Sequence, residues 1–275
     1  MTVSIVMITF NSVDVVEGAL KSAEGLWDEL LVGDGGSTDR TTGIVKKYGG
    51  KVIRPIQTNP TNLPITKNLG ERKRELVERA KGDWILVLDA DERVSEELRE
   101  EMKRLKDGKT GRKLDAYRIP YQNYVFGRPV YYGGEKYAKV RLFRRGYGRI
   151  SPEALHEEVI ITQKFPKARP SQRLRPGLEK GGLIGELKGV IHHHSYRTPW
   201  QLFTKFTRYA RTAAQEKKRQ GETLSIQKLF LYGPHMFLAR FIKEKGYKDG
   251  WRGLVLALAF GYMESMTYWL LLIRK

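Results

Sequence analysis

The sequence predicts an α/β fold with a mostly parallel central sheet, followed by a helical C-terminal region. Over residues 1–105, short apolar runs bounded by turn residues alternate with stretches of helical apolar spacing. Such alternation gives parallel strands joined by right-handed helical crossovers. From residue 198 the apolar spacing becomes helical. Sheets of this kind bind their ligands at the carboxyl ends of the strands.

The first apolar run, residues 3–10, is apolar enough to be a central strand. Asn11-Ser12 caps a helix over residues 13–27, and Asp14 and Glu17 suit the first turn of that helix. The later elements follow from the same signals. We predict a strand at 29–34, a helix at 42–48, a strand at 51–54, a loop at 55–64, a helix at 69–81, a strand at 84–88 and a helix at 95–105.

The strand predicted at residues 84–88 runs directly into Asp89-Ala90-Asp91. Its unbroken apolar run indicates burial on both faces. Two carboxylates so close in the chain repel each other, so a bound cation would stabilise this edge. Mg²⁺ and Mn²⁺ suit it, because they bind one or two protein carboxylates together with phosphate oxygens and water. The alternative is an acidic helix start without a metal.

Between residues 115 and 194 the helical pattern gives way to short strand-like pieces rich in Tyr and Arg, at 117–120, 121–126 and 140–143. Residues 164–188 carry prolines, glycines and many cations, which predicts a loop. The chain therefore divides into three predicted parts: residues 1–114, residues 115–197 and a basic, amphipathic helical region at residues 198–275.

Positive charge is concentrated in the second part of the chain. Residues 1–100 hold 14 Lys/Arg and 17 Asp/Glu, and the remaining residues hold 36 and 14, so the balances are −3 and +22. This asymmetry implies an acidic partner: nucleic acid, an anionic membrane surface or a phosphorylated substrate. A solvated basic face gives the same count. The chain has no cysteine, which excludes disulfides and thiol chemistry, and its N-terminus lacks signal-peptide features.

Two C-terminal helices are predicted, at residues 200–220 and 251–273. The first has an apolar face and a basic face. The second is nearly long enough to span a bilayer, but Glu264 lies near its middle, and a lone carboxylate is costly in lipid. The sequence favours a packed or oligomer-forming helix over an interfacial membrane helix, and an interfacial helix over a spanning one.

Several stretches together resemble the family 2 glycosyltransferases of the GT-A fold. They are Ile8-Thr9-Phe10-Asn11, GDGGSTDRT at 33–41 and VLDADE at 87–92. The second half resembles the lipopolysaccharide-core β-glucosyltransferase branch through VRLFRRGYGRI at 140–150, LHEEV at 155–159 and HHHSYR at 192–197. The resemblance covers residues 3 to about 260. It implies a Rossmann-like, nucleotide-binding sheet and a nucleotide-sugar donor.

The resemblance also implies roles for the strand ends. Asp34 would accept a hydrogen bond from the imide N–H of a uracil base, in a pocket shared with Thr9, Asn11 and Gly35. The alternative is that Asp34 only orders the turn that follows it.

The acidic motif after the central strand would hold the donor diphosphate. Asp89 and Ala90 would lie against the donor, with Asp89 facing the ribose or the metal. Asp91 would bind the Mn²⁺ or Mg²⁺ that bridges the diphosphate, orients the donor and neutralises the departing charge. The family's usual Arg-Asn pair is absent, and Lys73 stands near its place. Lys73 is therefore the expected diphosphate cation, and a solvated helix face is the alternative.

Inverting transfer to a hydroxyl needs a base. The resemblance places it at Glu157, oriented by His156, with Glu158 as the alternative. His193 matches a family histidine and would bind the metal or the diphosphate; a packing histidine is the alternative. The three consecutive histidines cannot share one ion, because neighbouring side chains on a strand point to opposite faces. A cluster of Arg141, Arg144 and Arg145 would bind a phosphate or be solvated.

We therefore predict a metal-dependent, inverting glycosyltransferase that moves a hexose from a nucleoside-diphosphate sugar, with UDP favoured. The predicted acceptor is a lipid-linked or lipopolysaccharide-type glycan at the cytoplasmic membrane face, where the basic second half would meet the surface. A soluble or protein acceptor, with a homodimer formed through the C-terminal helices, is one alternative. A nucleic-acid-binding protein is another, although no nucleic-acid motif is present. A nucleotidyltransferase would need a glycine-rich basic loop after the first strand, which the sequence lacks.

Overall fold

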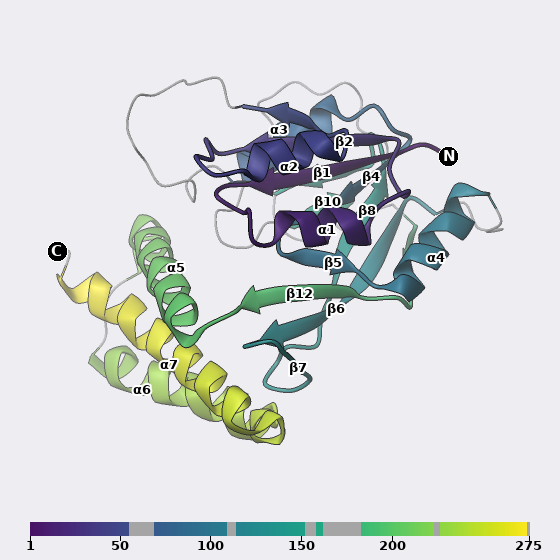
Figure 1. Ribbon diagram of the computed structural model, residues 1–275. Coiled ribbons are helices and arrows are strands. Elements are labelled where there is room, and N and C mark those ends of the chain that lie inside the picture. The colour runs from purple at the N-terminus through teal and green to yellow at the C-terminus, as the bar shows by residue number, and fades with distance from the viewer. Residues whose placement is uncertain (55–68, 109–113, 152–157, 162–182, 223–225, 274–275) are drawn as a thin grey trace. The chain divides into compact units, whose positions relative to one another are not determined.

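The computed structural model describes residues 1–54, 69–108, 114–151, 158–161, 183–222 and 226–273 (Figure 1). The chain forms two compact units, which are described separately. Unit 1 comprises Met1–Tyr121 and Ala138–His192, and unit 2 comprises Gln122–Tyr137 and His193–Lys275. The predicted division at residues 114 and 197 stays a prediction.

The first part of the sheet is parallel, as predicted. β1 (Val3–Thr9) pairs in parallel with β2 (Glu29–Asp34) on one side and with β4 (Trp84–Val87) on the other. β3 (Lys51–Ile53) adds in parallel to β2. All seven residues of β1 are buried because neighbouring strands cover both of its edges and other elements cover both of its faces. The end of β1 lies in register with the end of β2, so Thr9 stands opposite Asp34.

Beyond β4 the sheet continues with antiparallel pairing. β8 (Ala138–Arg144) is antiparallel to both β4 and β6 (Ala116–Val125), and the strand order then continues to β12 (Ile191–Tyr196) and β5 (Glu92–Val94). Short strands complete the arrangement: β7 (Arg128–Val130) and β11 (Ile184–Glu186) pair with β6, and β9 (Gly148–Ile150) pairs with β10 (Val159–Ile161).

Helices α1 (Val16–Ser22), α2 (Thr41–Lys47), α3 (Leu69–Arg79) and α4 (Glu96–Lys106) belong to unit 1 (Figure 1). Leu76 of α3 lies directly over Gly33 of β2, where an added Cβ would come within 3.2 Å of the leucine. Its neighbours in this core are apolar side chains of β1, β4 and β8, including Val6, Ile85 and Phe143. This packing fixes α3 against the strands whose ends carry the predicted site.

Unit 2 contains the C-terminal helices α5 (Pro199–Arg219), α6 (Ile226–Leu238) and α7 (Gly250–Ile273). The Thr198 side chain caps α5 by accepting a hydrogen bond from the Gln201 N–H. Between α6 and α7 the chain forms a π-helix, η2 (Ala239–Lys243), and a 3₁₀ turn, η3 (Gly246–Asp249). α5 and α6 both pack along α7.

The predicted fold class is confirmed: an α/β chain with a central sheet and C-terminal helices. Three details differ. The two strand pieces at 117–126 are one strand, β6. A strand, β11, lies inside the loop predicted at 164–188. The strand β5 was not predicted, because three residues after an acidic turn are too few to show the alternating pattern of a strand.

Candidate active site

Asp34 is fully buried at the end of β2, and its carboxylate is engaged by its own turn. One carboxylate oxygen accepts hydrogen bonds from the hydroxyls of Thr9 and Ser37. The other accepts the backbone N–H groups of Gly36 and Ser37 at 3.0 and 2.9 Å. Gly36 adopts a φ of +93°, which favours glycine. The alternative stated for Asp34, that it orders the turn, is thus realised, and a base contact would be an additional role.

The loops after β1 and β2 are joined to each other by side-chain caps. The Asn11 N–H donates to Ser37 Oγ at 2.9 Å, and the Asn11 side-chain oxygen accepts the Thr38 N–H at 2.9 Å. The Ser12 N–H donates to Thr41 Oγ1 at 2.8 Å, and Asp39 accepts the Val13 N–H at 3.2 Å. Asn11 itself has a φ of 44°, a region that asparagine tolerates better than most residues. The two strand ends therefore form one ordered edge, with Gly35 donating its N–H to the Thr9 carbonyl.

Asp89, the first acid after β4, lies between two cations. One of its oxygens is 2.9 Å from Lys73 Nζ, and the other is 3.1 Å from a guanidinium nitrogen of Arg141. Lys73 extends from α3 and is only 8% exposed. The solvated-face alternative for Lys73 is therefore wrong: α3 turns this lysine toward the acidic strand end. Ala90 is buried beside Asp89, and Asp91 is half-buried.

Arg141 is anchored by a buried acid that the sequence reading did not single out. Glu92 is 1% exposed and lies 2.9 Å from an Arg141 guanidinium nitrogen. The other Glu92 oxygen accepts the Asp89 N–H at 2.9 Å. The Tyr121 hydroxyl donates to Glu92 at 2.8 Å and accepts a short hydrogen bond from Arg141 Nε. This network fixes both the backbone and the carboxylate of Asp89.

The pKa values of this network follow from its burial and charge. Burial raises the pKa of the Tyr121 hydroxyl well above 10, against the Arg141 charge that lowers it. Burial opposes the Arg141 charge, but Glu92, Tyr121 and Asp89 together raise the pKa of Arg141 well above its usual value. Burial and the neighbouring Arg141 charge lower the pKa of Lys139. Tyr121 stays neutral and Arg141 stays charged at physiological pH.

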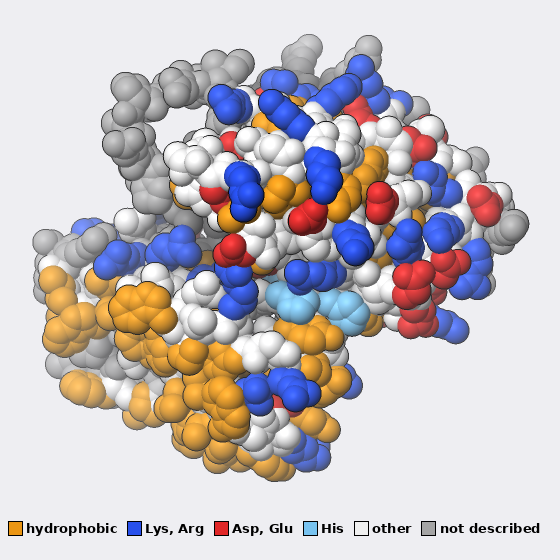
Figure 2. All heavy atoms as spheres, viewed as in Figure 1, with side chains coloured by type: hydrophobic (Ala, Val, Ile, Leu, Met, Phe, Trp, Pro, Cys, Tyr) orange, Lys and Arg blue, Asp and Glu red, His pale blue; other side chains and the backbone are white. Residues whose placement is uncertain are grey.

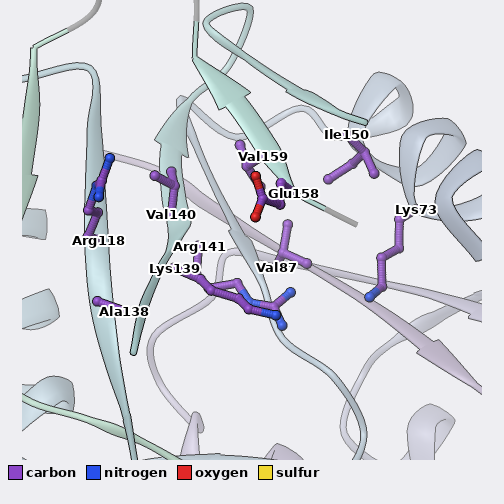
Figure 3. A pocket seen from close by; sticks show the side chains of 10 residues that line it. All are labelled: Lys73, Val87, Arg118, Ala138, Lys139, Val140, Arg141, Ile150, Glu158 and Val159. Carbon is purple, nitrogen blue, oxygen red and sulfur yellow. The ribbon is translucent and has the colours of Figure 1, made fainter. Parts of the chain in front are cut away.

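A pocket of about 200 Å³ opens beside these residues (Figure 3). Lys73 and Arg141 point toward one another across it, and Glu158 reaches in from the start of β10. Glu158, the alternative to Glu157 as the base, thus lines this pocket. Four of the lining side chains are cationic: Lys73, Arg118, Lys139 and Arg141.

The predicted arginine cluster does not form. Arg141 is buried in the pocket wall, whereas Arg144 is half-exposed, 3.8 Å from Asp115 and stacked over Tyr147. Arg145 is exposed in the turn after β8. Alternation along the strand separates Arg144 from Arg141, because residues three apart point to opposite faces, and Arg145 lies beyond the end of the strand. His156 and Glu157 lie outside the described residues.

His193 belongs to unit 2 and sits in a polar network there. Its Nδ1 lies 3.0 Å from Asn123 Oδ1 and 2.9 Å from Ser195 Oγ. Asn123 in turn donates to the Glu135 carboxylate at 2.8 Å, which also pairs with Arg240 at 2.9 Å. These contacts fix the orientation of the imidazole ring. Over the part of the chain that the structure describes, no three His, Cys, Asp or Glu side chains are close enough to hold a metal by themselves.

Comparison with known sequences decides the family. The model of the family described as Glycosyl transferase family 2 matches residues 4–155, which is more than half of the chain. The chain belongs to glycosyl transferase family 2. It is thus a glycosyltransferase of the GT-A fold class, as the resemblance predicted, and the matched region contains Asp34, Lys73, Asp89 and Arg141.

This family 2 glycosyltransferase has relatives that match over most of its length. An uncharacterised glycosyltransferase of Rickettsia prowazekii is 24% identical over 96% of this chain and 84% of its own length. The lipopolysaccharide core biosynthesis glycosyltransferase LpsC of Rhizobium meliloti is 24% identical over 87% of this chain and 80% of its own length. Among solved structures, S. aureus TarS (residues 1–349) is 15% identical with a TM-score of 0.47, and the match covers 98% of this chain and 89% of that one.

Proposed function

We propose that this enzyme transfers a hexose, with inversion, from a UDP-sugar to a hydroxyl of a lipid-linked or lipopolysaccharide-type glycan, with a divalent metal. One observation carries the proposal. The first acid of the Asp-x-Asp motif is held between Lys73 and Arg141, at a pocket that Glu158 also lines. Neighbouring residues of one unit thereby offer cations for a donor diphosphate and a candidate base, beside the acidic turn that carries Asp91.

The donor nucleoside would bind at the ordered edge formed by the β1 and β2 loops. Thr9, Asn11, Asp34 and Gly35 line that edge, and their mutual hydrogen bonds hold it in shape before any ligand arrives. Preorganisation of this kind lowers the entropic cost of binding. In this proposal Asp34 orders the loop and also accepts the imide N–H of the base.

Mn²⁺ or Mg²⁺ fits the acidic turn. Asp89 is already compensated by two protein cations, so Asp91 is the proposed protein ligand, and these ions commonly use one or two protein carboxylates with phosphate oxygens and water. When bound, the ion would orient the diphosphate and offset its charge. His193, whose ring is held by Asn123 and Ser195, is proposed as a further nitrogen ligand.

The transfer itself needs a proton acceptor and a stabilised leaving group. The acceptor oxygen attacks the anomeric carbon, a new C–O bond forms, and the C–O bond to the diphosphate breaks. The hydroxyl proton passes to the base, for which we propose Glu157 with His156 orienting it, and Glu158 as the alternative. Lys73 would offset the negative charge that develops on the departing diphosphate.

The lipid-linked acceptor rests on two considerations. LpsC, similar to this chain over most of its length, is named for lipopolysaccharide core biosynthesis. The balance of +22 over residues 101–275 suits an anionic glycolipid surface. The proposed location is therefore the cytoplasm, peripheral on the inner face of the membrane. A soluble or protein acceptor is the alternative.

The test is calorimetry with UDP, GDP, ADP and CMP, each with and without Mn²⁺. We expect one diphosphate to bind only with the metal, and this binding to disappear in Asp91→Ala while Asp107→Ala, on an exposed helix end, leaves it unchanged. If none of the four nucleotides binds more tightly with Mn²⁺ than without it, the metal-dependent mechanism is refuted. Hydrolysis of the matching sugar nucleotide would then identify the sugar.

A further inference from the structure

The C-terminal helices of unit 2 expose large apolar side chains in two stripes. On α6 and η2 they are spaced seven and then four residues apart, at Leu231, Leu238 and Ile242, which are 50–62% exposed. On α7 they recur at helical spacing along one face: Trp251, Leu254, Leu258, Trp269 and Leu272, which are 38–53% exposed. Figure 2 shows hydrophobic side chains gathered over α7 in the lower part of the view. Exposed apolar patches of this extent mark interaction surfaces.

The same helices also pack closely against one another and against α5. Gly233 of α6 meets α7 so closely that an added Cβ would lie 1.8 Å from Ser265 Oγ and 2.9 Å from the Gly261 carbonyl oxygen. Leu256 and Ala259 of α7 are buried against α5. Large apolar side chains of α6, η2 and α7 therefore stay exposed although these helices pack closely.

A cluster of cations stands at the turn between the stripes. Lys243, Lys245 and Lys248 are exposed in and beside η2 and η3, with Glu244 the acid among them. Unit 2 as a whole holds 17 Lys/Arg against 6 Asp/Glu, a balance of +11. Long cationic side chains beside an apolar face can reach lipid phosphates while the face enters the acyl region. Tryptophans at both ends of the α7 stripe suit the same interface.

The packing of α5 against α7 limits how α7 can contact a bilayer. Residues Gly246–Ile273 are long and apolar enough to cross a membrane, judged by length and composition. However, α5 packs along α7, from the Phe206–Phe260 ring contact to the Lys217 ammonium over the Tyr268 ring. The outer face of α5 exposes Arg208, Arg211, Lys218 and Arg219. A spanning α7 would carry these cations into the hydrocarbon, so the packing favours α7 lying parallel to the surface.

We propose that the α6–α7 stripes and the lysines at their turn form a docking surface that binds an anionic phospholipid bilayer in its interfacial plane. This inference extends the proposed lipid-linked acceptor, but it rests on the helices alone. A second copy of the chain is the competing occupant. Two copies of unit 2, each with a charge balance of +11, would repel each other, whereas an anionic bilayer attracts that positive charge.

The test is co-sedimentation of the full-length protein with vesicles of phosphatidylcholine, alone or mixed with phosphatidylglycerol. We expect the intact chain to bind the anionic vesicles and to be released by salt. Leu254→Glu/Leu258→Glu should weaken this binding by ~10-fold or more, because apolar insertion is lost. Lys243→Ala/Lys245→Ala/Lys248→Ala should weaken it by roughly 100-fold, at about fivefold for each cation.

Matched controls lie in unit 1. Leu183→Glu changes a leucine that is 62% exposed, and Lys46→Ala/Lys47→Ala/Lys51→Ala removes the same charge from an exposed surface. Both should bind vesicles like the intact chain, and circular dichroism should show that all variants are folded.

Three results would overturn the proposal. One is the absence of vesicle binding, or equal binding to neutral and anionic vesicles. Another is a dimer in light scattering that Leu258→Glu converts to a monomer. The third is resistance to carbonate extraction, which would indicate a spanning helix.

Loss of vesicle binding in a variant that still hydrolyses the sugar nucleotide separates this surface from the active site. A failed donor panel beside intact vesicle binding would refute the proposed function alone.

Discussion

The Arg141 guanidinium and the Glu92 carboxylate form a buried ion pair, 2.9 Å apart, directly behind the Asp-x-Asp turn. Glu92 also accepts the Asp89 N–H, and Arg141 also contacts the Asp89 side chain. Glu92 therefore holds the backbone of Asp89, and Arg141 holds its carboxylate. Glu92 and Arg141 act on the site by positioning Asp89.

Arg141→Met should destabilise the fold by roughly 3–5 kcal/mol, because it leaves Glu92 buried without its counter-ion. Arg144→Met, which removes a half-exposed arginine from the same strand, should cost at most about 1 kcal/mol. Urea unfolding measures both. Adding Glu92→Gln to Arg141→Met should recover much of the loss. If the double variant is no more stable than the single one, the pair is not the cause.

Lys73→Met should reduce kcat/KM for the sugar nucleotide by roughly 10- to 1,000-fold, since it removes a cation that we place at the departing diphosphate. Lys47→Met, on the exposed surface of α2, should leave kcat/KM unchanged. Steady-state kinetics with the donor identified by calorimetry provides the measurement. Unchanged kinetics in Lys73→Met would limit Lys73 to pairing with Asp89.

Asp34→Asn separates the two roles of Asp34. The asparagine oxygen can still accept the Gly36 and Ser37 N–H groups, and its amide can donate to the Thr9 and Ser37 hydroxyls. Stability should therefore change by less than about 1 kcal/mol, whereas Asp34→Ala should cost roughly 1–3 kcal/mol more. Donor KM should nevertheless rise ~10-fold in Asp34→Asn if the carboxylate accepts the base imide. If the donor KM of Asp34→Asn equals that of the wild type, Asp34 only orders the turn and does not bind the base.

Glu222 should make the helices of unit 2 sensitive to acid. Hydrogen bonds from Lys217 and Lys228 lower the pKa of Glu222 from 4.5 to about 2. Because the folded-state pKa is the lower one, the stabilisation is present above pH 4.5 and is lost as the pH falls toward 2. Urea midpoints of the wild type and of Glu222→Gln should differ at pH 7 and converge at low pH. A constant difference across that range would contradict the assignment.

Gly233→Ala should destabilise the α6–α7 pair by roughly 1–3 kcal/mol, because the new Cβ meets Ser265 and the Gly261 carbonyl. Gly43→Ala, in the open surface of α2, has nothing within 4 Å of the new Cβ and should stabilise by roughly 0.5–1 kcal/mol. Thermal unfolding compares the two. A Gly233→Ala protein as stable as wild type would mean that the helices can separate without cost.

The strands were predictable wherever an apolar run met a turn signal. β1, β2 and β4 lie within one residue of their predicted ends, since burial on both faces leaves an unbroken apolar run. α6 was not bounded in advance: Gly233 and Pro234 interrupt its pattern, and the packing against α7 that sustains it is a tertiary contact.

The site was predictable where a local motif carries the chemistry. Asp34, Asp89 and Asp91 follow strands, and strand ends gather at one edge. Glu92 could have been suspected from its place beside Asp91, but its pairing with Arg141 joins residues far apart in the chain. Arg141 was read as one of three phosphate-binding or solvated arginines, because a sequence does not show which face of a strand is covered.

The position of β1 between β2 and β4 also affects how the chain is made. β1 is synthesised before both of its neighbours, and the strand that closes its second edge begins only at Trp84. At about 5–20 residues per second, a ribosome leaves that edge open for several seconds. An apolar, β-prone segment with an open edge is an aggregation hazard. Nascent chains that stall before residue 84 are therefore expected clients of ribosome-associated chaperones.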